Sequence, residues 1–272
     1  MGRDGIPRQE AESPIGDIAY LTRSEHRVTT LVALTERPRS RSELCELTGV
    51  SSSTARRTIG EFEDRSWVQK DGYQYEATPL GEAVASGMAD LLDRVETENK
   101  LRDVWHQLPE QVIELTLGTS STVTVSEHDA PYRPLNRYRA LFHESSRYRF
   151  VGFDVGLYEA CKDEFQQRVL DGMEAEIIDP PSVARYMIST YPERCADLLE
   201  RGNMTVLLHD DVPYYGLCLF DEKTAICVYN SDGGGLNMLI DTDAPAAYQW
   251  AESIYTSYKA DARPLESHAI LE

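Results

Sequence analysis

Short hydroxyl side chains and two arginines stand together between residues 51 and 57. Four successive hydroxyl residues at 51–54 are followed, one alanine later, by Arg56 and Arg57. Hydroxyl and guanidinium groups donate hydrogen bonds to phosphate oxygens, and arginine also recognises the edge of guanine. Short side chains at the start of a helix would let that helix approach a DNA groove closely. The residue types therefore predict a DNA-contacting helix over about residues 51–65.

The preceding segments have the signals needed to position such a helix. Ser24 is a candidate N-cap for a helix that runs to about residue 36. Ser40 and Glu43 have the spacing of a capping box, which opens a second helix. Gly49 suits the left-handed turn that ends that helix, and Ser51 suits the N-cap of the third. The spacing thus predicts a helix-turn-helix over residues 40–65.

A β-hairpin is expected directly after the third helix. Short strand patterns at residues 67–70 and 73–76 flank Asp71-Gly72, a pair typical of tight hairpins. The order of helices followed by a hairpin indicates a winged helix-turn-helix over residues 14–78. A plain helical subdomain with a hairpin, or a winged helix that binds a protein partner, remains an alternative. The predicted DNA contacts are Arg39, Arg41, Ser51, Ser52, Ser53, Thr54, Arg56, Arg57, Lys70, Tyr73 and Gln74.

The charge of the chain is strongly acidic but unevenly distributed. Aspartate and glutamate number 46 against 27 lysines and arginines, which gives a formal charge of −19. Only five residues are lysine, a composition that resembles proteins of salt-accumulating archaea. Residues 37–70 hold seven basic and five acidic side chains, so the proposed DNA-binding segment is a positive island. Its charge fits a polyanionic partner on a molecule that would otherwise repel one.

Other global features favour a cytoplasmic protein without a membrane span. No apolar run approaches the roughly 20 residues that cross a bilayer, and residues 1–13 read as a disordered polar tail. The five cysteines lack the spacing of zinc ligands, and burial is the expected role of each. We therefore expect neither a metal nor a cofactor.

A long helical pattern joins the two halves of the chain over residues 79–109. Thr78-Pro79 is a favourable start, and Leu108-Pro109 marks the end. An apolar stripe near helical spacing consists of Val84, Met88, Leu91, Val95 and Trp105, with polar interruptions. Such a helix is expected to pack on its twin in a homodimer. Packing on its own C-terminal domain is the alternative.

Residues 110–272 alternate between strand and helix patterns, which predicts an α/β domain with a mixed, partly parallel sheet. Strands are expected at 122–126, 148–155, 175–178, 204–208, 215–220, 224–229 and 236–240. Helices are expected at 135–144, 158–170, 182–200 and 244–260.

The first half resembles archaeal regulators of the ArsR/MarR/TrmB kind. The resemblance covers about residues 15–110 and is carried by 41–57 and by Tyr75-Glu76-Ala77-Thr78-Pro79-Leu80-Gly81-Glu82. It implies a transcriptional regulator that binds double-stranded DNA, and as a dimer it would bind two half-sites.

The second half is similar, more weakly, to the middle-domain family of the methanogenesis regulatory protein, which has a phospholipase D-like fold. The resemblance rests on residues 210–216, the hairpin after them, and residues 232–234 and 244–251. It implies a domain that senses a small-molecule effector or mediates dimerisation.

Enzymatic function is not expected from these residues. Phospholipase D chemistry uses a nucleophilic histidine with a lysine two residues later, and none of the six histidines has one. A phospholipase D-like phosphodiesterase with an appended winged helix is therefore the disfavoured alternative. Gly233-Gly234-Gly235 lacks the lysine of a P-loop, and Asp210-Asp211 on so acidic a chain fits a solvated turn better than a metal site.

Effector contacts are expected where parallel strands end, because ligands of α/β sheets gather outside the carboxyl ends of the strands. Asp154, Asp179 and Asp210 follow predicted strands, and Tyr214 and Tyr215 come shortly after the third. These five residues are the predicted ligand contacts. The alternative is that the domain binds no ligand and serves only dimerisation.

Overall fold

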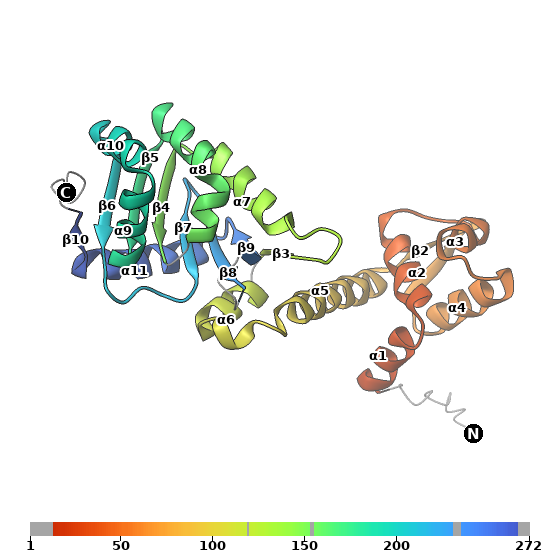
Figure 1. Cartoon of the computed structure of the whole chain (residues 1–272). Coiled ribbons are helices and arrows are strands. Elements are labelled where there is room, and N and C mark those ends of the chain that lie inside the picture. Colours follow the sequence, from red (N-terminus) through yellow and green to blue (C-terminus); the bar gives the residue numbers. More distant parts are fainter. Residues whose placement is uncertain (1–12, 119, 153–154, 231–234, 266–272) are drawn as a thin grey trace, which may run out of the picture. The chain divides into compact units, whose positions relative to one another are not determined.

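A computed structural model describes residues 13–118, 120–152, 155–230 and 235–265 of the chain. The chain divides into two compact units, Met1–Glu96 and Thr97–Glu272. Each has hydrophobic clusters of its own, and Figure 1 labels the elements of both. Across the described residues, no helix combines the length and the apolar character that a membrane crossing would need.

The first unit consists of helices and one hairpin around a small core. Leu31, Leu44, Phe62 and Trp67 are buried in this core. The elements are α1 (Pro14–Thr22), α2 (Glu25–Glu36), α3 (Arg41–Thr48), α4 (Ser52–Asp64), β1 (Val68–Asp71), β2 (Gln74–Ala77) and the start of α5 (Pro79–Leu101).

Local capping signals set the ends of α3 and α4 as the sequence predicts. The Ser40 hydroxyl accepts a hydrogen bond from the Glu43 amide, and the Glu43 carboxylate accepts one from the Ser40 amide. Gly49 adopts a left-handed conformation with φ of 69°, and the Ser51 hydroxyl accepts from the Thr54 amide. Ser24 precedes α2 as expected, but its side chain makes no capping hydrogen bond.

The hairpin turn lies one residue later than predicted. Asp71 pairs with Gln74 in the antiparallel register, so Gly72 and Tyr73 form the turn. Gly72 has a φ of 58°, which glycine adopts at little cost. The glycine thus takes the first position of the turn, and Asp71 remains in the strand.

Helix α5 begins as predicted but ends before the expected residue 108. The Thr78 hydroxyl accepts from the Gly81 amide at the N-terminus. Gly81 packs so closely on β1 that an added Cβ would lie 1.9 Å from the Trp67 carbonyl oxygen. Beyond residue 101 the chain turns, because Val104 and Leu108 are buried in the core of the second unit. The boundary between the units falls inside α5, at Glu96 and Thr97.

The second unit is built on a mixed sheet of order β10-β6-β5-β4-β7-β8-β9-β3. Strands β4, β5 and β6 are parallel, and the other neighbouring pairs are antiparallel, which confirms the predicted α/β class with a partly parallel sheet. The strands are β3 (Thr122–Val125), β4 (Arg147–Val151), β5 (Glu174–Asp179), β6 (Met204–Leu208), β7 (Gly216–Leu219), β8 (Thr224–Tyr229), β9 (Leu236–Thr242) and β10 (Arg263–Pro264).

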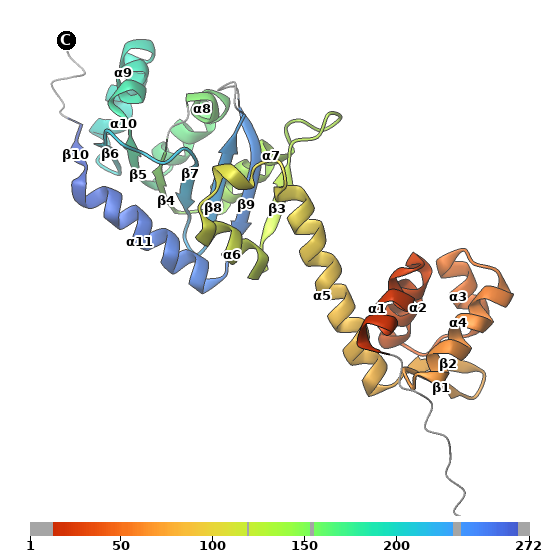
Figure 2. The same cartoon turned by 90° about the horizontal axis from the view of Figure 1, so that it is seen from below.

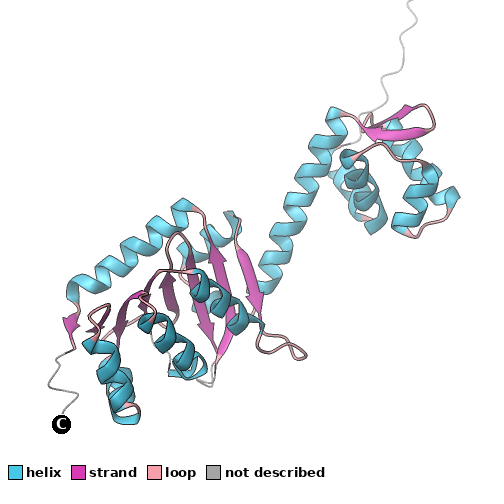
Figure 3. Ribbon diagram, turned by 90° about the horizontal axis from the view of Figure 1, so that it is seen from above, coloured by secondary structure: helices cyan, strands magenta, loops and turns pink. Residues whose placement is uncertain are grey.

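Helices cover both faces of this sheet, as Figures 2 and 3 show. One face is covered by α7 (Arg133–Glu144), α8 (Val155–Leu170), α9 (Pro181–Thr190) and α10 (Pro192–Glu200), and the other by α6 (Glu110–Gly118) and α11 (Pro245–Asp261). Alternate residues of the central strands face opposite cores: Cys218 belongs to the α7–α10 side, and Leu217 and Leu219 belong to the α6–α11 side. Strands buried on both faces read as continuous apolar runs.

Several boundaries differ from the sequence-based expectation. Strand β4 ends at Val151 instead of 155, and the predicted helix 182–200 is interrupted at Tyr191-Pro192, since proline cannot donate its backbone nitrogen to a continuing helix. Helices α1 and α6 and strand β10 were not predicted. Ser13 caps α1 through a hydrogen bond from the Gly16 amide, so it does not belong to the predicted tail, and residues 1–12 lie outside the described residues.

Candidate nucleic-acid interface

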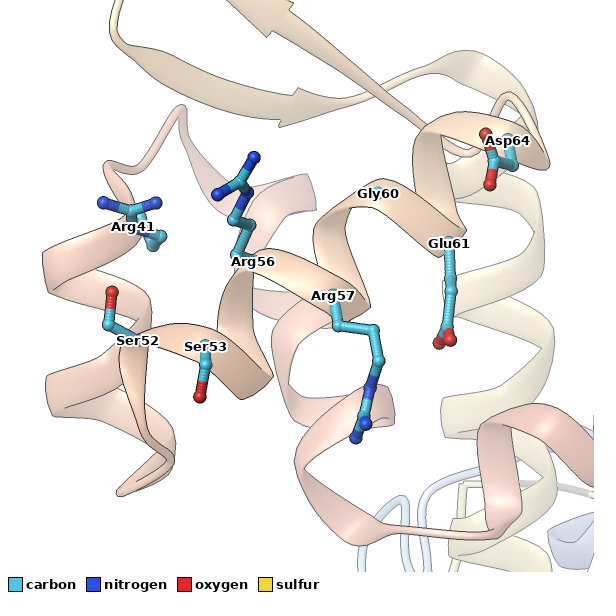
Figure 4. Close-up of a pocket in the computed structure, with 8 residues that line it drawn as sticks. All are labelled: Arg41, Ser52, Ser53, Arg56, Arg57, Gly60, Glu61 and Asp64. Carbon is cyan, nitrogen blue, oxygen red and sulfur yellow. The ribbon is translucent and has the colours of Figure 1, made fainter.

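The polar face of the first unit is formed by α3, α4 and the hairpin. Arg41 on α3 and Ser52 and Arg56 on α4 point the same way, and Arg57 projects from the other side of α4 (Figure 4). These four side chains line one hollow of about 630 Å³, together with Ser53, Gly60, Glu61 and Asp64. Two successive helices thus present their N-terminal ends on one open surface.

A second hollow of about 570 Å³ lies between the helices and the hairpin. Arg41 and Ser52 line it from the helices, and Lys70, Tyr73 and Tyr75 line it from the strands and their turn. Arg41 and Ser52 belong to both hollows, so the surface is continuous from α4 to the hairpin. A groove bounded by a helix N-terminus and a hairpin has the shape that accepts a nucleic-acid backbone.

Four cations on this face have no ion-pair partner among the described residues: Arg41, Arg56, Arg57 and Lys70, all of which are exposed. Other arginines of the unit serve the fold instead. Arg37 pairs with Glu43 at 2.8 Å, and Arg65 pairs with Asp17 at 2.9 Å. The unpaired cations are therefore available to an anionic ligand.

The electrostatics of α4 favour anions at its first turns. This helix has no acidic residue in its first turn, and the helix dipole adds partial positive charge there. Glu61 and Asp64 lie nearer its C-terminal end. A polyanion would therefore be attracted to the N-terminal half of the helix and repelled from the C-terminal half.

The predicted hydroxyl residues differ in their tasks. Ser51 caps α4, and its hydroxyl also lies 3.0 Å from those of Ser53 and Thr54. Ser52 is exposed and lines both hollows. The capping hydroxyl is needed by the fold, and Ser52 is placed to face a ligand.

The structure gives Arg39 a role within the fold. Its guanidinium donates to the Ala33 carbonyl oxygen at 2.8 Å and pairs with Glu36 at 2.5 Å. Its backbone exchanges two hydrogen bonds with Tyr75 of the hairpin, at 2.9 and 2.8 Å. The side chain is held on α2 and the backbone pairs with the hairpin, so the structure gives Arg39 a positioning role, and its predicted DNA contact stays a prediction.

The hairpin carries the remaining predicted contacts. Tyr73 at the turn is 94% exposed, and Lys70 and Gln74 are exposed on the two strands. Gly60 of α4, which lines the same hollow as Arg56, was not identified from the sequence. Gly60 lies four residues after Arg56, and a Cβ added there would meet nothing within 4 Å. Because Gly60 has no side chain, a ligand could approach the α4 backbone closely there. Its position four residues after Arg56, on the same face of the helix, is the signal that could have identified it.

Of the five predicted ligand contacts of the second unit, the four that the structure describes have different surroundings. Asp210 forms an ion pair with Arg263, with contacts of 2.9 and 3.2 Å, and these hydrogen bonds lower the pKa of its carboxyl group. Tyr214 is 96% exposed, and burial raises the pKa of Tyr215 to about 12. Asp179 lines a small, partly open cavity, and its described lining does not include Asp210, Tyr214 or Tyr215. Asp154 lies outside the described residues.

His209 lies beside two acidic residues and an aromatic ring of α11. The Nδ1 of His209 accepts from the Asp211 amide at 3.1 Å, and its ring packs on Tyr258. Over the described part of the chain, no group of three or more histidine, cysteine or acidic residues is arranged to hold a metal ion. Residues 233 and 234 of the glycine run lie outside the described residues.

Two family models match the chain, one in each unit. Residues 15–100 match the HVO_A0261 N-terminal domain, and residues 131–261 match the middle domain of the methanogenesis regulatory protein FilR1. Each model matches one part of the chain, and together they leave the segment 101–130 between them unmatched. The resemblance of both halves to archaeal regulators is thereby confirmed. No match to the chain was found among curated proteins.

Solved structures show weaker likenesses. TrmBL2, described as an archaeal chromatin protein with a novel mode of DNA binding, has 11% identity and a TM-score of 0.43, with 92% of this chain and 99% of that chain covered. NucT from Helicobacter pylori has 12% identity and a TM-score of 0.39, covering 54% and 99%. The phospholipase D family member Nuc from Salmonella typhimurium has 10% identity and a TM-score of 0.37, covering 54% and 99%. TM-scores below 0.5 are too low to assign a function to this chain.

Proposed function

We propose that the protein is a DNA-binding transcriptional regulator whose recognition helix is α4. The observation that carries the proposal is the set of four exposed cations without ion-pair partners around the N-terminus of α4. On a chain of formal charge −19, such a surface fits a polyanion. Its charge would suit DNA and an acidic protein equally, so the shape of the surface is what favours DNA. The helix and hairpin match the shape of a DNA groove and its flanking backbone.

The placement of the side chains suggests a division of labour on DNA. Arg56 and Ser52 project from the exposed face of α4, where base edges of the major groove would lie. Arg41 and Lys70 line the hollow between the helices and the hairpin, and they would contact phosphates that border the DNA groove. Tyr73, at the hairpin turn, would lie on the backbone or in the minor groove.

We further propose that the regulator acts as a homodimer formed through apolar faces of the first unit. In α5, the stripe that includes the buried Met88 continues past the core to Leu91, Leu92 and Val95, which are between 44% and 48% exposed. A second copy would offer an identical stripe, as an isologous interface requires. Two linked units would also bind two half-sites, which raises affinity without new contacts.

Helix α1 adds a second exposed apolar face to this argument. Ile15 and Ile18 are 78% and 49% exposed, and Ala19 and Thr22 continue the same face at helical spacing. The opposite side of α1 buries Leu21 in the core. A helix that is apolar on both sides gains stability when its outer side is also covered.

The second unit is proposed to sense a small molecule or to support dimerisation. A ligand that binds one arrangement of the dimer more tightly would shift the population towards it and so change the spacing of the two α4 helices. Transcriptional output would then follow the ligand.

DNA binding is tested with the full chain and duplexes selected from the genome of its source, by fluorescence anisotropy at several potassium concentrations. We expect Arg56→Ala/Arg57→Ala to weaken binding at least tenfold, because a lost base or phosphate contact costs roughly 1–3 kcal/mol. The matched control is Arg185→Ala/Arg201→Ala, which removes the same charge from exposed positions in the second unit. Equal losses for both pairs, or no selected duplex at all, would contradict the proposal.

Dimerisation is tested separately by light scattering coupled to gel filtration. Leu92→Glu/Val95→Glu should convert the dimer to a monomer, because like charges would face each other across the two-fold axis. Tyr214→Glu introduces a charge at a position that is 96% exposed and should leave the mass unchanged. A wild-type chain that is monomeric at every concentration would overturn the dimer and leave the DNA-binding surface untouched.

A further inference from the structure

A small, partly open cavity of about 50 Å³ lies in the second unit, between the sheet and helices α7 and α8. Its wall is mainly aromatic and is formed by Tyr138, Phe142, Tyr148, Phe150, Tyr158 and Phe165. All of these side chains except Tyr158 are buried. The aromatic rings of the wall come from two helices and one strand, and the half-buried Tyr158 and Asp179 lie where the hollow is partly open.

The size of the cavity restricts what it can hold. A water molecule needs roughly 10–15 Å³ on the same measure, so the space corresponds to about four waters. That is room for a compact group of about five non-hydrogen atoms, and it is too small for a sugar or a nucleotide. A larger ligand would place only one end inside.

The charge of the wall restricts the ligand further. Asp179, the last residue of β5, lines the cavity, and the described lining includes no lysine, arginine or histidine. A carboxylate or phosphate would find a negative neighbour and no counter-charge there. Aromatic faces, by contrast, attract cations, and an adjacent carboxylate strengthens that attraction.

Two tyrosine hydroxyls add a polar feature to the wall. The hydroxyls of Tyr138 and Tyr148 are buried and lie 2.8 Å apart. Burial raises the pKa of both groups, so both remain neutral. Two hydroxyls have two protons, and one mutual hydrogen bond uses only one of them. The pair therefore retains one donor without making the wall positively charged.

We infer that this cavity binds a small organic cation of the alkylammonium class, or the cationic end of a longer molecule, with aromatic rings around its methyl groups and Asp179 near its charge. The binding stands independently of DNA recognition. Its role as a regulatory signal rests on the proposed function.

The test uses choline as the cation and 3,3-dimethyl-1-butanol as its neutral isostere, titrated into the full chain. Isothermal calorimetry gives the affinity, and upfield shifts of the choline methyl protons report contact with aromatic rings. We expect saturable binding of choline and at least tenfold weaker binding of the neutral molecule. Equal affinities, tighter binding of the alcohol, or no binding of choline at tens of millimolar would overturn the inference.

Two variants locate the site. Asp179→Asn removes the charge with little change in shape and should weaken choline binding about tenfold or more. Asp210→Asn is the matched control, because Asp210 follows the neighbouring strand β6 but pairs with Arg263 outside the cavity. Wild-type affinity in Asp179→Asn, or an equal loss in Asp210→Asn, would overturn the assignment to this cavity.

A cavity-filling variant covers the case in which Asp179→Asn disturbs the fold. Cys161→Leu puts a larger side chain into the wall and should abolish choline binding in a protein that still unfolds cooperatively, although overpacking should cost roughly 1–3 kcal/mol of stability. Retained binding in a folded Cys161→Leu protein would contradict the inference.

Regulation is read separately from binding. Choline should change the DNA affinity of the wild type and not that of Asp179→Asn. The Arg56→Ala/Arg57→Ala variant should still bind choline, so failure of DNA recognition and failure of cation binding are distinguishable.

Discussion

The two units use charged side chains in opposite ways. On the α3–α4 face of the first unit, exposed arginines stand without ion-pair partners among the described residues. In the second unit, most arginines and lysines are paired, as in the two-pronged contact of Arg137 with Asp241 at 3.0 and 2.6 Å. Arg41, Arg56, Arg57 and Lys70 thus differ both from most described cations of the second unit and from Arg37, Arg39 and Arg65 of their own unit, which hold elements together.

The contrast extends to the surfaces that could bind a ligand. The first unit offers an open, polar hollow, which suits a large and hydrated polyanion. The second unit offers a small aromatic cavity with one carboxylate, which suits a compact cation. Each unit would thus exclude the ligand of the other, and the predictions below test this separation.

The largest expected effect is the dependence of DNA affinity on salt. If Arg41, Arg56, Arg57 and Lys70 all neutralise phosphates, log K should fall against log salt with a slope of about −3.6 per DNA-binding unit, so that a fourfold rise in salt weakens binding roughly 100-fold; with Arg56 on a base edge instead, the slope should be about −2.7. Arg56→Ala/Arg57→Ala should reduce the slope by about 1.8 per unit if both contact phosphates. Anisotropy titrations over a salt series measure it. An unchanged slope in that variant, or an equal reduction in Arg185→Ala/Arg201→Ala, would contradict the claim that cations of the first unit, and not of the second, contact DNA.

Breaking the Arg137–Asp241 pair should reduce stability rather than binding. Asp241 is buried, so Asp241→Asn leaves a cation without its partner; because Arg137 is 37% exposed, we expect a loss of about 2 kcal/mol. Denaturant unfolding measures it. Glu252→Gln, which removes the half-exposed partner of Arg149, should cost less than about 1 kcal/mol. Stability losses of the same size in Arg56→Ala would show that the α4 cations are structural too.

Two glycines of α5 provide a matched pair for the first unit. Gly81→Ala should destabilise it by about 1–3 kcal/mol, because the new methyl group would meet the Trp67 carbonyl oxygen, which also accepts from the Thr78 amide at 2.9 Å. Gly87→Ala meets nothing within 4 Å and should stabilise the helix by up to about 1 kcal/mol. Thermal unfolding resolves both. DNA binding should fall only for Gly81→Ala, and choline binding should survive in each; a common loss would mean that the units are not independent.

The smallest expected effect is an acid dependence that Glu43 adds to the first unit. Hydrogen bonds from the Ser40 amide and hydroxyl, and then from Arg37, lower the pKa of Glu43 to about 2 from a usual value near 4.5. A lowered pKa in the folded state stabilises the fold above pH 4.5, and this contribution is lost as the pH falls towards 2. Glu43→Gln should therefore unfold with a weaker acid dependence over that range. Identical pH profiles in denaturant titrations would contradict the capping-box account.

Signals between neighbouring residues predicted the ends of helices most reliably. The capping box at Ser40 and Glu43 and the turn at Gly49 are made by neighbouring residues, so their spacing alone predicted α3 and α4. The break at Tyr191-Pro192 was missed although proline marks it, because the apolar pattern continues across the break. The early end of α5 was missed because it depends on burial of Val104 and Leu108 against distant strands.

The candidate sites were predictable to different degrees. Most of the residues predicted to contact DNA lie within one short segment, and the structure places Arg41, Ser52, Arg56 and Arg57 around one hollow, while their contact with DNA stays a prediction. The role of Arg39 within the fold was not predicted, since its hydrogen bond to Ala33 and its backbone pairing with Tyr75 follow from folding of the hairpin onto α2. The aromatic cavity joins residues from Tyr138 to Asp179 across helices and strands, and no local pattern indicates that their rings surround a common space.

The most direct test of the account asks where α4 lies on DNA. An iron-chelate cleavage reagent is attached through Ser53→Cys in a Cys45→Ser/Cys195→Ser background, which leaves Cys161, Cys218 and Cys227 buried. We predict cleavage confined to a few base pairs in the major groove of each half-site, and none when the reagent is attached through Ser257→Cys on α11. Uniform cleavage, or the same pattern from both positions, would contradict the placement of α4 in the groove.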